Sequence, residues 1–204
     1  MHFSKDHINA LETRTRAHFI NSLSGFKSAN LIGTQDRQGN TNLSIVSSVI
    51  HLGANPPLMG MIIRPHNVPR HTFENIMQTG LYTINHVNQS IYEQAHQTSA
   101  RYDKDESEFE ATGLTPEYLL DFSAPFVKES RLKYSVKLVE HQHLAINDTE
   151  FVIGEIVDVY VDDNAVQTDG FIDLQAIDTV AISGLDCYYT GDKLARLPYA
   201  KKKL

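Results

Sequence analysis

Two arginines and two histidines lie in the proline-punctuated stretch RPHNVPRHTFENI, residues 64–76, which leads into a candidate helix. Thr72 is a good N-cap residue, and Asn75 three positions later gives a loose form of the capping box. A helix N-terminus presents unpaired N–H groups and about half a positive charge, so it attracts anions. Arg64 and Arg70 flank this point, and a guanidinium matches the geometry of a phosphate. The stretch predicts a phosphate-sized anion site, with plain helix capping beside solvated arginines as the alternative.

The chain as a whole is acidic, which limits the kind of anion it binds. Its 204 residues carry 18 Lys and Arg against 25 Asp and Glu, a formal net charge of −7. A protein that binds nucleic acid needs a broad basic face, so we expect no nucleic-acid partner. The basic run at residues 201–203 is too short to change this balance. A local cationic site on an acidic protein favours a small anionic ligand.

The composition is that of a globular protein, with 41% hydrophobic and 21% charged residues. No apolar run approaches the length that spans a bilayer, and the N-terminal segment MHFSKDHINALE lacks the pattern of a secretory signal. The chain has a single cysteine, Cys187, so we expect neither an internal disulfide nor a cysteine-based zinc site. These features predict a cytoplasmic protein without a membrane partner.

Strand patterns and short helix patterns alternate along the chain. Apolar positions at helical spacing, ending at Gly25, predict a helical extension over residues 1–25. Residues 30–50 predict a hairpin with Gly39 in its turn. The remaining expectations are a strand at 58–63, a helix at 73–79 ended by Gly80, a strand at 81–87, a helix at 88–97, a surface loop at 99–110, a helix start at 115–120, and strands at 132–144 and 151–161. We expect one domain over residues 1–204, mainly β (α+β), with an antiparallel barrel and short helical insertions.

The strand at residues 41–48 carries a small polar set on one face. Alternation places Asn42, Ser44 and Ser48 on that face, and Leu43, Ile45 and Ser47 on the other. An Asn side chain offers both a donor and an acceptor, as recognition of the edge of a flat polar heterocycle requires. Ordinary solvent exposure explains the same pattern, so both interpretations stay open here.

In order and spacing, these motifs resemble the flavin reductase-like family of FMN-binding split barrels over roughly residues 25–200. The matching positions are Thr34, Asp36, Gly39, Asn42, Ser47, Asn55-Pro56-Pro57, Arg64, Thr72, Asn75-Ile76, Thr79-Gly80, Asn85, Phe109 to Leu114, Ala124-Pro125, Glu129-Ser130 and Ile153 to Ile156. The resemblance implies a six-stranded antiparallel split β-barrel with Greek-key connections. It also implies a homodimer with the flavin near the subunit interface.

The resemblance implies a binding site for FMN. Its phosphate would be held by Ser47, Ser48, Arg64 and the helix start at Thr72, and the isoalloxazine edge would meet residues 42–44. The full set of expected cofactor-binding residues is Asn42, Leu43, Ser44, Ser47, Ser48, Val49, Arg64, His71, Thr72 and Asn75. Tyr188 or Tyr189 either approaches the flavin or serves in packing. No catalytic residue is assigned, because the flavin itself performs hydride transfer.

The expected activity is therefore that of an FMN-dependent oxidoreductase with NADH or NADPH as donor and a small-molecule or protein acceptor. Many family members have a histidine where this chain has Phe151-Val152, which leaves the use of NAD(P)H open. One alternative is a flavoredoxin-type FMN electron carrier, and another is a flavin-free binding barrel. His141 and His143 share a strand face and lack a third ligand, so surface histidines are favoured over a metal site.

Overall fold

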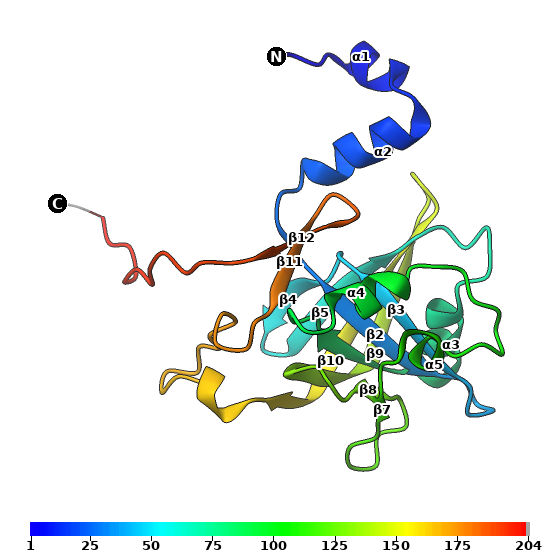
Figure 1. The fold of residues 1–204 in the computed structure, drawn as a ribbon, viewed down its shortest axis with the longest axis vertical. Coiled ribbons are helices and arrows are strands. Elements are labelled where there is room, and N and C mark those ends of the chain that lie inside the picture. Colours follow the sequence, from blue (N-terminus) through cyan, green and yellow to red (C-terminus); the bar gives the residue numbers. More distant parts are fainter. Residues whose placement is uncertain (203–204) are drawn as a thin grey trace.

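The structure, a computed structural model, describes residues 1–202 and is mainly β (Figure 1). The largest sheet has seven antiparallel strands in the order β3-β2-β6-β9-β10-β5-β4. Their bounds are β2 Asn30–Gln35, β3 Thr41–Val46, β4 Ile50–Ala54, β5 Pro57–Ile63, β6 Leu81–His86, β9 Leu132–Leu144 and β10 Thr149–Val161. Because β6 returns to pair with β2 after the β4–β5 hairpin, neighbours in the sheet are not always neighbours in sequence.

Two smaller sheets and short helices complete the described fold. The three-stranded sheet has the order β1-β11-β12, and β7 pairs with β8. The bounds of these strands are β1 Lys27–Ser28, β7 Pro116–Glu117, β8 Phe126–Val127, β11 Val180–Ser183 and β12 Cys187–Thr190. The helices are α1 Lys5–Ala10, α2 Thr13–Ser22, α3 His71–Thr79, α4 Tyr92–Gln97, α5 Glu108–Thr112 and the 3₁₀ turn η1 Asp163–Ala165. The single-domain boundary at 1–204 remains an expectation.

Two positive-φ glycines end elements where the sequence predicts. Gly39 has φ 94° in the turn between β2 and β3, and Gly80 has φ 73° directly after α3. The Gly80 N–H donates to the Ile76 carbonyl at 2.8 Å, which closes the last helical turn. A side chain at either φ would be strained, so these glycines fix the hairpin and the exit of α3.

The long β9–β10 hairpin forms one wall of the barrel. Its register shifts twice, between Ile153 and Gly154 and between Ile156 and Asp158. Gly154 faces the interior so closely that a Cβ there would lie 2.3 Å from the Tyr82 hydroxyl. The absence of a side chain at this position therefore lets β10 pack against β6.

The N-terminal extension differs from the rest of the molecule. Residues 1–25 contain two helices, α1 and α2, and neither buries any residue. Figure 1 shows both helices, in blue, standing away from the sheets, with the C-terminal segment in red running out separately. The expected helical extension is confirmed, with a break between Ala10 and Thr13.

Several predicted elements are wrong or shifted. Residues 115–120 do not start a helix, because Pro116 and Glu117 pair with Val127 and Phe126 as β7 and β8. The helix predicted at 88–97 begins only at Tyr92, and the loop predicted at 99–110 ends at α5, which begins at Glu108. The large sheet has seven strands where six were expected. No helix among residues 1–202 is long and apolar enough to cross a membrane.

Candidate functional site

A cavity of about 1020 Å³ opens between β3, β5, the start of α3 and the loop that precedes α5. Its size is at the upper end of small-molecule and cofactor sites, roughly 300–1,000 Å³. Asn21 from α2 and Tyr188 from β12 complete the rim. Strands far apart in sequence therefore meet the cationic stretch 64–76 at one concave surface.

The start of α3 differs from the predicted cap. The helix begins at His71, and its N-cap residue is Arg70, whose side chain makes no capping bond. Thr72 thus lies inside the first turn, and its hydroxyl contacts Ser44 Oγ at 2.7 Å and the Asn42 amide at 2.8 Å. The predicted N-cap role of Thr72 is wrong, because its hydroxyl forms hydrogen bonds with side chains of β3.

Asn75 also leaves the predicted capping box. Its amide donates to Thr34 Oγ1 at 3.1 Å, inside the structure. Asn75 is buried and does not line the large cavity. It fastens α3 to β2 and so supports the cavity wall from behind.

Glu108 is an acidic group in this wall that sequence patterns did not single out. The residue is 6% exposed and lines the cavity at the first position of α5. Its Oε2 accepts the Leu43 N–H at 2.9 Å. Burial raises the pKa of the Glu108 carboxyl, and the Leu43 N–H opposes that rise. A buried carboxyl beside Asn42 and Ser44 gives the wall a strong acceptor.

Three guanidinium groups, from Arg64, Arg70 and Arg101, line the same cavity. None of them takes part in an ion pair among residues 1–202. Burial lowers the pKa of Arg70, and the nearby Arg64 and Arg101 charges lower it further. Like charges held together in this way favour binding of an anion, which would relieve their repulsion.

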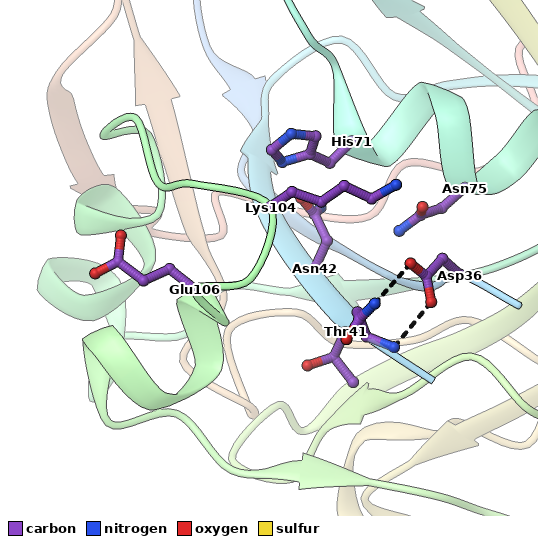
Figure 2. Close-up of a pocket in the computed structure, with 8 residues that line it drawn as sticks. Asp36, Thr41, Asn42, His71, Asn75, Lys104 and Glu106 are labelled. Atoms are coloured by element: carbon purple, nitrogen blue, oxygen red, sulfur yellow. Dashed lines mark hydrogen bonds between the residues drawn. The ribbon is translucent and has the colours of Figure 1, made fainter. Parts of the chain in front are cut away.

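A small side pocket of about 10 Å³ adjoins the start of α3, with room for about one water. Figure 2 shows Lys104 reaching across Asn42 with its ammonium end toward Asn75 and Asp36. The Asp36 carboxylate is already held by Asn40, through the backbone N–H and the side-chain amide at 2.9 Å each. Lys104 also lines the large cavity, so it adds a fourth cationic side chain to Arg64, Arg70 and Arg101.

The two predicted phosphate serines differ in their surroundings. Both line the cavity. Ser48 Oγ donates to the Ile62 carbonyl at 2.8 Å and accepts the Ile62 N–H at 3.2 Å, so it joins residue 48 to β5. Its remaining hydrogen-bonding capacity is therefore small, which makes Ser47 the better candidate for an anion.

Two other predicted residues face away from the cavity. The Leu43 side chain is fully buried in a core cluster, and Val49 packs against a second cluster. Neither lines the cavity. Any contact they make with a cavity ligand would have to come from the backbone, and the Leu43 N–H is already bonded to Glu108.

His96 and Tyr188 form a pair in the cavity lining. The His96 Nδ1 lies 3.0 Å from the Tyr188 hydroxyl, and both residues line the cavity. Burial raises the pKa of Tyr188 to about 12, and the Asp186 charge adds to the rise. Tyr188 also packs against the buried core cluster that includes Leu43 and Ile182, so it has a packing role as well as a place in the cavity lining.

The histidines at the tip of the β9–β10 hairpin lie outside the cavity. His141 Nε2 is 2.5 Å from Glu150 Oε2, and His143 Nδ1 is 3.0 Å from Glu150 Oε1. In the described chain, no group of three or more His, Cys, Asp or Glu is arranged to hold a metal ion. The shared strand face predicted for this pair is confirmed, and both imidazoles are directed at a carboxylate.

Sequence reasoning missed Arg101, Lys104 and Glu108 for one reason. All three fall in the charged segment 99–110, whose lack of a helical or strand period predicts a surface loop. The structure folds this segment over the cavity. Its excess of both charge signs was the available signal, but the composition of a loop does not reveal which way it faces.

The similarity of the chain to known proteins concerns its family and its fold. A family model described as "Flavin reductase like domain" matches residues 23–177. A crystal structure from Shewanella frigidimarina NCIMB 400, of a split-barrel protein assigned as a flavin reductase, is 96% identical and has a TM-score of 0.95. The match covers 98% of this chain and 100% of that one.

Two more distant structures share the fold. Nitrilotriacetate monooxygenase component B from Bacillus cereus has a TM-score of 0.84 at 19% identity, over 97% of this chain and 98% of that one. Flavoredoxin of Desulfovibrio vulgaris (Miyazaki F) has a TM-score of 0.75 at 24% identity, over 86% and 92%. The mainly β split-barrel fold expected from the sequence is confirmed.

Proposed function

Because the chain belongs to the flavin reductase-like family, we propose that it is an FMN-binding oxidoreductase that takes electrons from NADH or NADPH. The observation that carries the proposal is the cavity, which is lined both by three guanidinium groups that make no ion pair among residues 1–202 and by polar side chains of β3. FMN has the matching division into a phosphate and a flat polar ring. When bound, the flavin supplies the hydride chemistry.

The phosphate is proposed to lie against the cations. Arg64 and Ser47 would donate to its oxygens, with Arg70 and Arg101 adding charge. The neighbouring Arg70 is half-buried, and this burial lowers its pKa, whereas Arg64 is exposed. Shielding strengthens the attraction between a guanidinium and a dianion.

The ring edge is proposed to lie against β3. Asn42 and Ser44 line the cavity and are held in place by Thr72. Because these side chains are already held in place, they lose little conformational entropy when they bind the ring. Of the expected set, Leu43, Val49 and Asn75 would support the site from behind without touching the ligand through their side chains.

The proposal includes a homodimer, as the family resemblance implies. Helices α1 and α2 bury no residue within one chain, and Ile20 in α2 and Leu23 and Phe26 after it remain exposed. Short helices are marginal in water without packing partners, and a second subunit would supply them. Sedimentation equilibrium tests this point, and a mass of one chain in solution would remove the dimer from the proposal.

The flavoredoxin-type carrier is the second candidate. The fold likeness to a flavoredoxin supports it, together with the absence of a histidine at Phe151-Val152. Steady-state oxidation of NADH and NADPH by the FMN-loaded protein separates the two functions. Turnover with a small acceptor supports the oxidoreductase, whereas flavin binding without turnover supports the carrier.

The first experiment is the visible absorbance spectrum of the purified protein before and after excess FMN and desalting. Retention of one FMN per chain is expected. Arg64→Ala should weaken FMN binding by ~1.5–3 kcal/mol, which is the usual value of a hydrogen bond to a charged group. Arg37→Ala is the matched control, because Arg37 is exposed and lies outside the cavity. Unchanged affinity in Arg64→Ala would remove the phosphate assignment.

A further inference from the structure

We propose that Glu108 sets the direction of a hydrogen-bond chain, Ser44–Thr72–Asn42–Glu108, so that Ser44 presents an acceptor to the cavity. This inference rests on the proposed function, because the group to be accepted is the imide N–H of a flavin ring. Glu108 is thus a positioning residue that acts through Asn42 and Thr72. Its effect is to select ligands whose polar edge carries a donor at this point.

The hydrogen-bond chain begins at Glu108, whose ionised carboxylate accepts hydrogen bonds and cannot donate them. Glu108 Oε2 accepts the Leu43 N–H at 2.9 Å, which leaves Oε1 to face the Asn42 amide. With the Asn42 Nδ2 turned toward it, Oε1 accepts a bond of 3.2 Å. The opposite orientation would set the Asn42 carbonyl oxygen against the carboxylate, acceptor against acceptor. Both residues are 6% exposed, so water offers little relief.

Each later bond follows from this first one. With Nδ2 on Glu108, the Asn42 Oδ1 accepts from Leu43 N at 3.1 Å and from Thr72 Oγ1 at 2.8 Å. Thr72 has one hydroxyl proton and has now used it. The contact of 2.7 Å between Thr72 Oγ1 and Ser44 Oγ must then take its proton from Ser44. Ser44 is left with lone pairs alone to offer the cavity that it lines.

A flip of the Asn42 side-chain amide would reverse the direction of the bonds along the hydrogen-bond chain. Asn42 Nδ2 can also donate to Thr72 Oγ1 at 2.8 Å. Thr72 would then donate to Ser44, and the Ser44 proton would be free to point into the cavity. One amide rotation therefore converts the Ser44 hydroxyl from an acceptor to a donor, and the Glu108 carboxylate decides between the two states.

The ligand class follows from the acceptor. The polar edge of an oxidised flavin has a single N–H between two carbonyl groups, and an acceptor-only hydroxyl matches the N–H. Against the carbonyls, the same hydroxyl would leave two acceptors in contact in a shielded site. The hydrogen-bond chain thus determines that the N–H of the ring edge, and not a carbonyl oxygen, faces Ser44.

The test is a double-mutant cycle on FMN binding at pH 8, with Glu108→Gln, Ser44→Ala and the double variant. Gln keeps the shape, and its amide can donate to Asn42 and so permits the reversed chain. Glu108→Gln should raise the Kd for FMN about tenfold, the loss of one hydrogen bond in a shielded site. In the Ser44→Ala background the same substitution should change Kd by less than about twofold, since Ser44 transmits the effect.

The matched control is Glu110→Gln on the same helix, because Glu110 is exposed and outside the cavity. Its Kd for FMN should equal that of the natural chain. An equal Kd in Glu108→Gln, or the same tenfold loss with and without Ser44, would overturn the inference. The second result would mean that Glu108 acts by general support of the fold.

A measurement without flavin keeps this test separate from the proposed function. The side-chain amide resonances of Asn42 in the apoprotein should shift in Glu108→Gln and stay in place in Glu110→Gln. If the Asn42 resonances do not shift in Glu108→Gln, the proposed hydrogen-bond chain is refuted even if FMN binds. Failure of the natural chain to bind FMN would instead remove the proposed function and the ligand class, while shifted Asn42 resonances would still support the chain.

Discussion

The cavity wall and the tip of the β9–β10 hairpin each hold a glutamate that is almost fully shielded, Glu108 at 6% and Glu150 at 7% exposure. Their carboxyl pKa values move in opposite directions. Burial dominates at Glu108 and raises its pKa. At Glu150 burial also acts to raise the pKa, but the hydrogen bonds from His141 and His143 outweigh it and leave the pKa lowered.

The difference lies in the donors that each carboxylate receives. Glu108 meets a backbone N–H and a neutral amide, which stabilise its charge weakly. Glu150 meets two imidazoles at 2.5 Å and 3.0 Å. Exposure alone therefore does not determine how firmly a carboxylate stays ionised. The hairpin cluster fixes a charge, whereas the cavity wall uses its acid to orient neutral groups.

Thr72→Val is expected to have the largest effect on the cavity side. Valine keeps the shape but removes the hydroxyl that joins Asn42 to Ser44, so buried polar groups lose their partner. We expect a loss of about 1–3 kcal/mol in the free energy of unfolding, with weaker FMN binding. Urea unfolding and FMN titration measure both.

Thr79→Val on the same helix is its control. Thr79 Oγ1 bonds to the Asn75 carbonyl of its own helix and does not line the cavity. This variant should keep the FMN affinity of the natural chain. Equal losses of affinity in the two threonine variants would show that the helix, and not the polar wall, governs binding.

Glu150→Gln should have an intermediate effect, confined to stability. At neutral pH we expect a loss of about 1 kcal/mol with unchanged FMN affinity, because the cluster lies outside the cavity. The folded pKa of Glu150 is below its ordinary value of 4.5. Its stabilising contribution is therefore present above that value and is lost as pH falls through the lowered folded pKa.

Unfolding free energies of the natural chain and Glu150→Gln, measured between neutral and acidic pH, test this sign. The two curves should converge below the ordinary glutamate pKa. A gap that stays constant on acidification would mean that the carboxylate charge contributes nothing and that shape alone distinguishes the variants. A fall in FMN affinity in Glu150→Gln would show that the hairpin cluster and the cavity wall do not act independently.

His143→Gln should have the smallest effect. The His143 side chain is 49% exposed, so solvent screens its interaction with Glu150. We expect a change of at most about 0.5 kcal/mol in the free energy of unfolding. Thermal unfolding beside Glu150→Gln gives the comparison, and a larger loss in His143→Gln than in Glu150→Gln would refute the assignment of Glu150 as the centre of the cluster.

Much of the fold follows from local requirements that the sequence displays. Gly39 and Gly80 occupy positions of positive φ, which few other residues tolerate, and both mark the ends of elements as predicted. Burial alternates along β10 because one of its faces packs inward, whereas residues 132–136 of β9 are buried on both faces. The Pro116 segment was mispredicted because its pairing with Val127 depends on residues 11 positions away.

The candidate site was less accessible from sequence. The sequence identified Arg64 and the small polar set on β3, because residue type alone suggests their chemistry. It assigned Thr72 the wrong role, because the hydroxyl has partners on β3 that compete with the helix terminus. Glu108 stayed hidden, because its burial depends on how α5 packs on β3.

Helices α1 and α2 have a consequence for the order in which the molecule opens. With no residue buried in its own chain, this segment adds almost nothing to the cooperative unit formed by the sheets. In a single chain without a partner subunit, the amides of this segment should exchange with solvent through local opening at nearly zero free-energy cost, whereas those of β2, β6 and β9 exchange only on global unfolding. The segment is tied to the body through the Lys27 ammonium, which bonds to the Asn21 and Gly184 carbonyls. Since Asn21 lines the cavity, the least protected part of the chain contributes to the cavity lining.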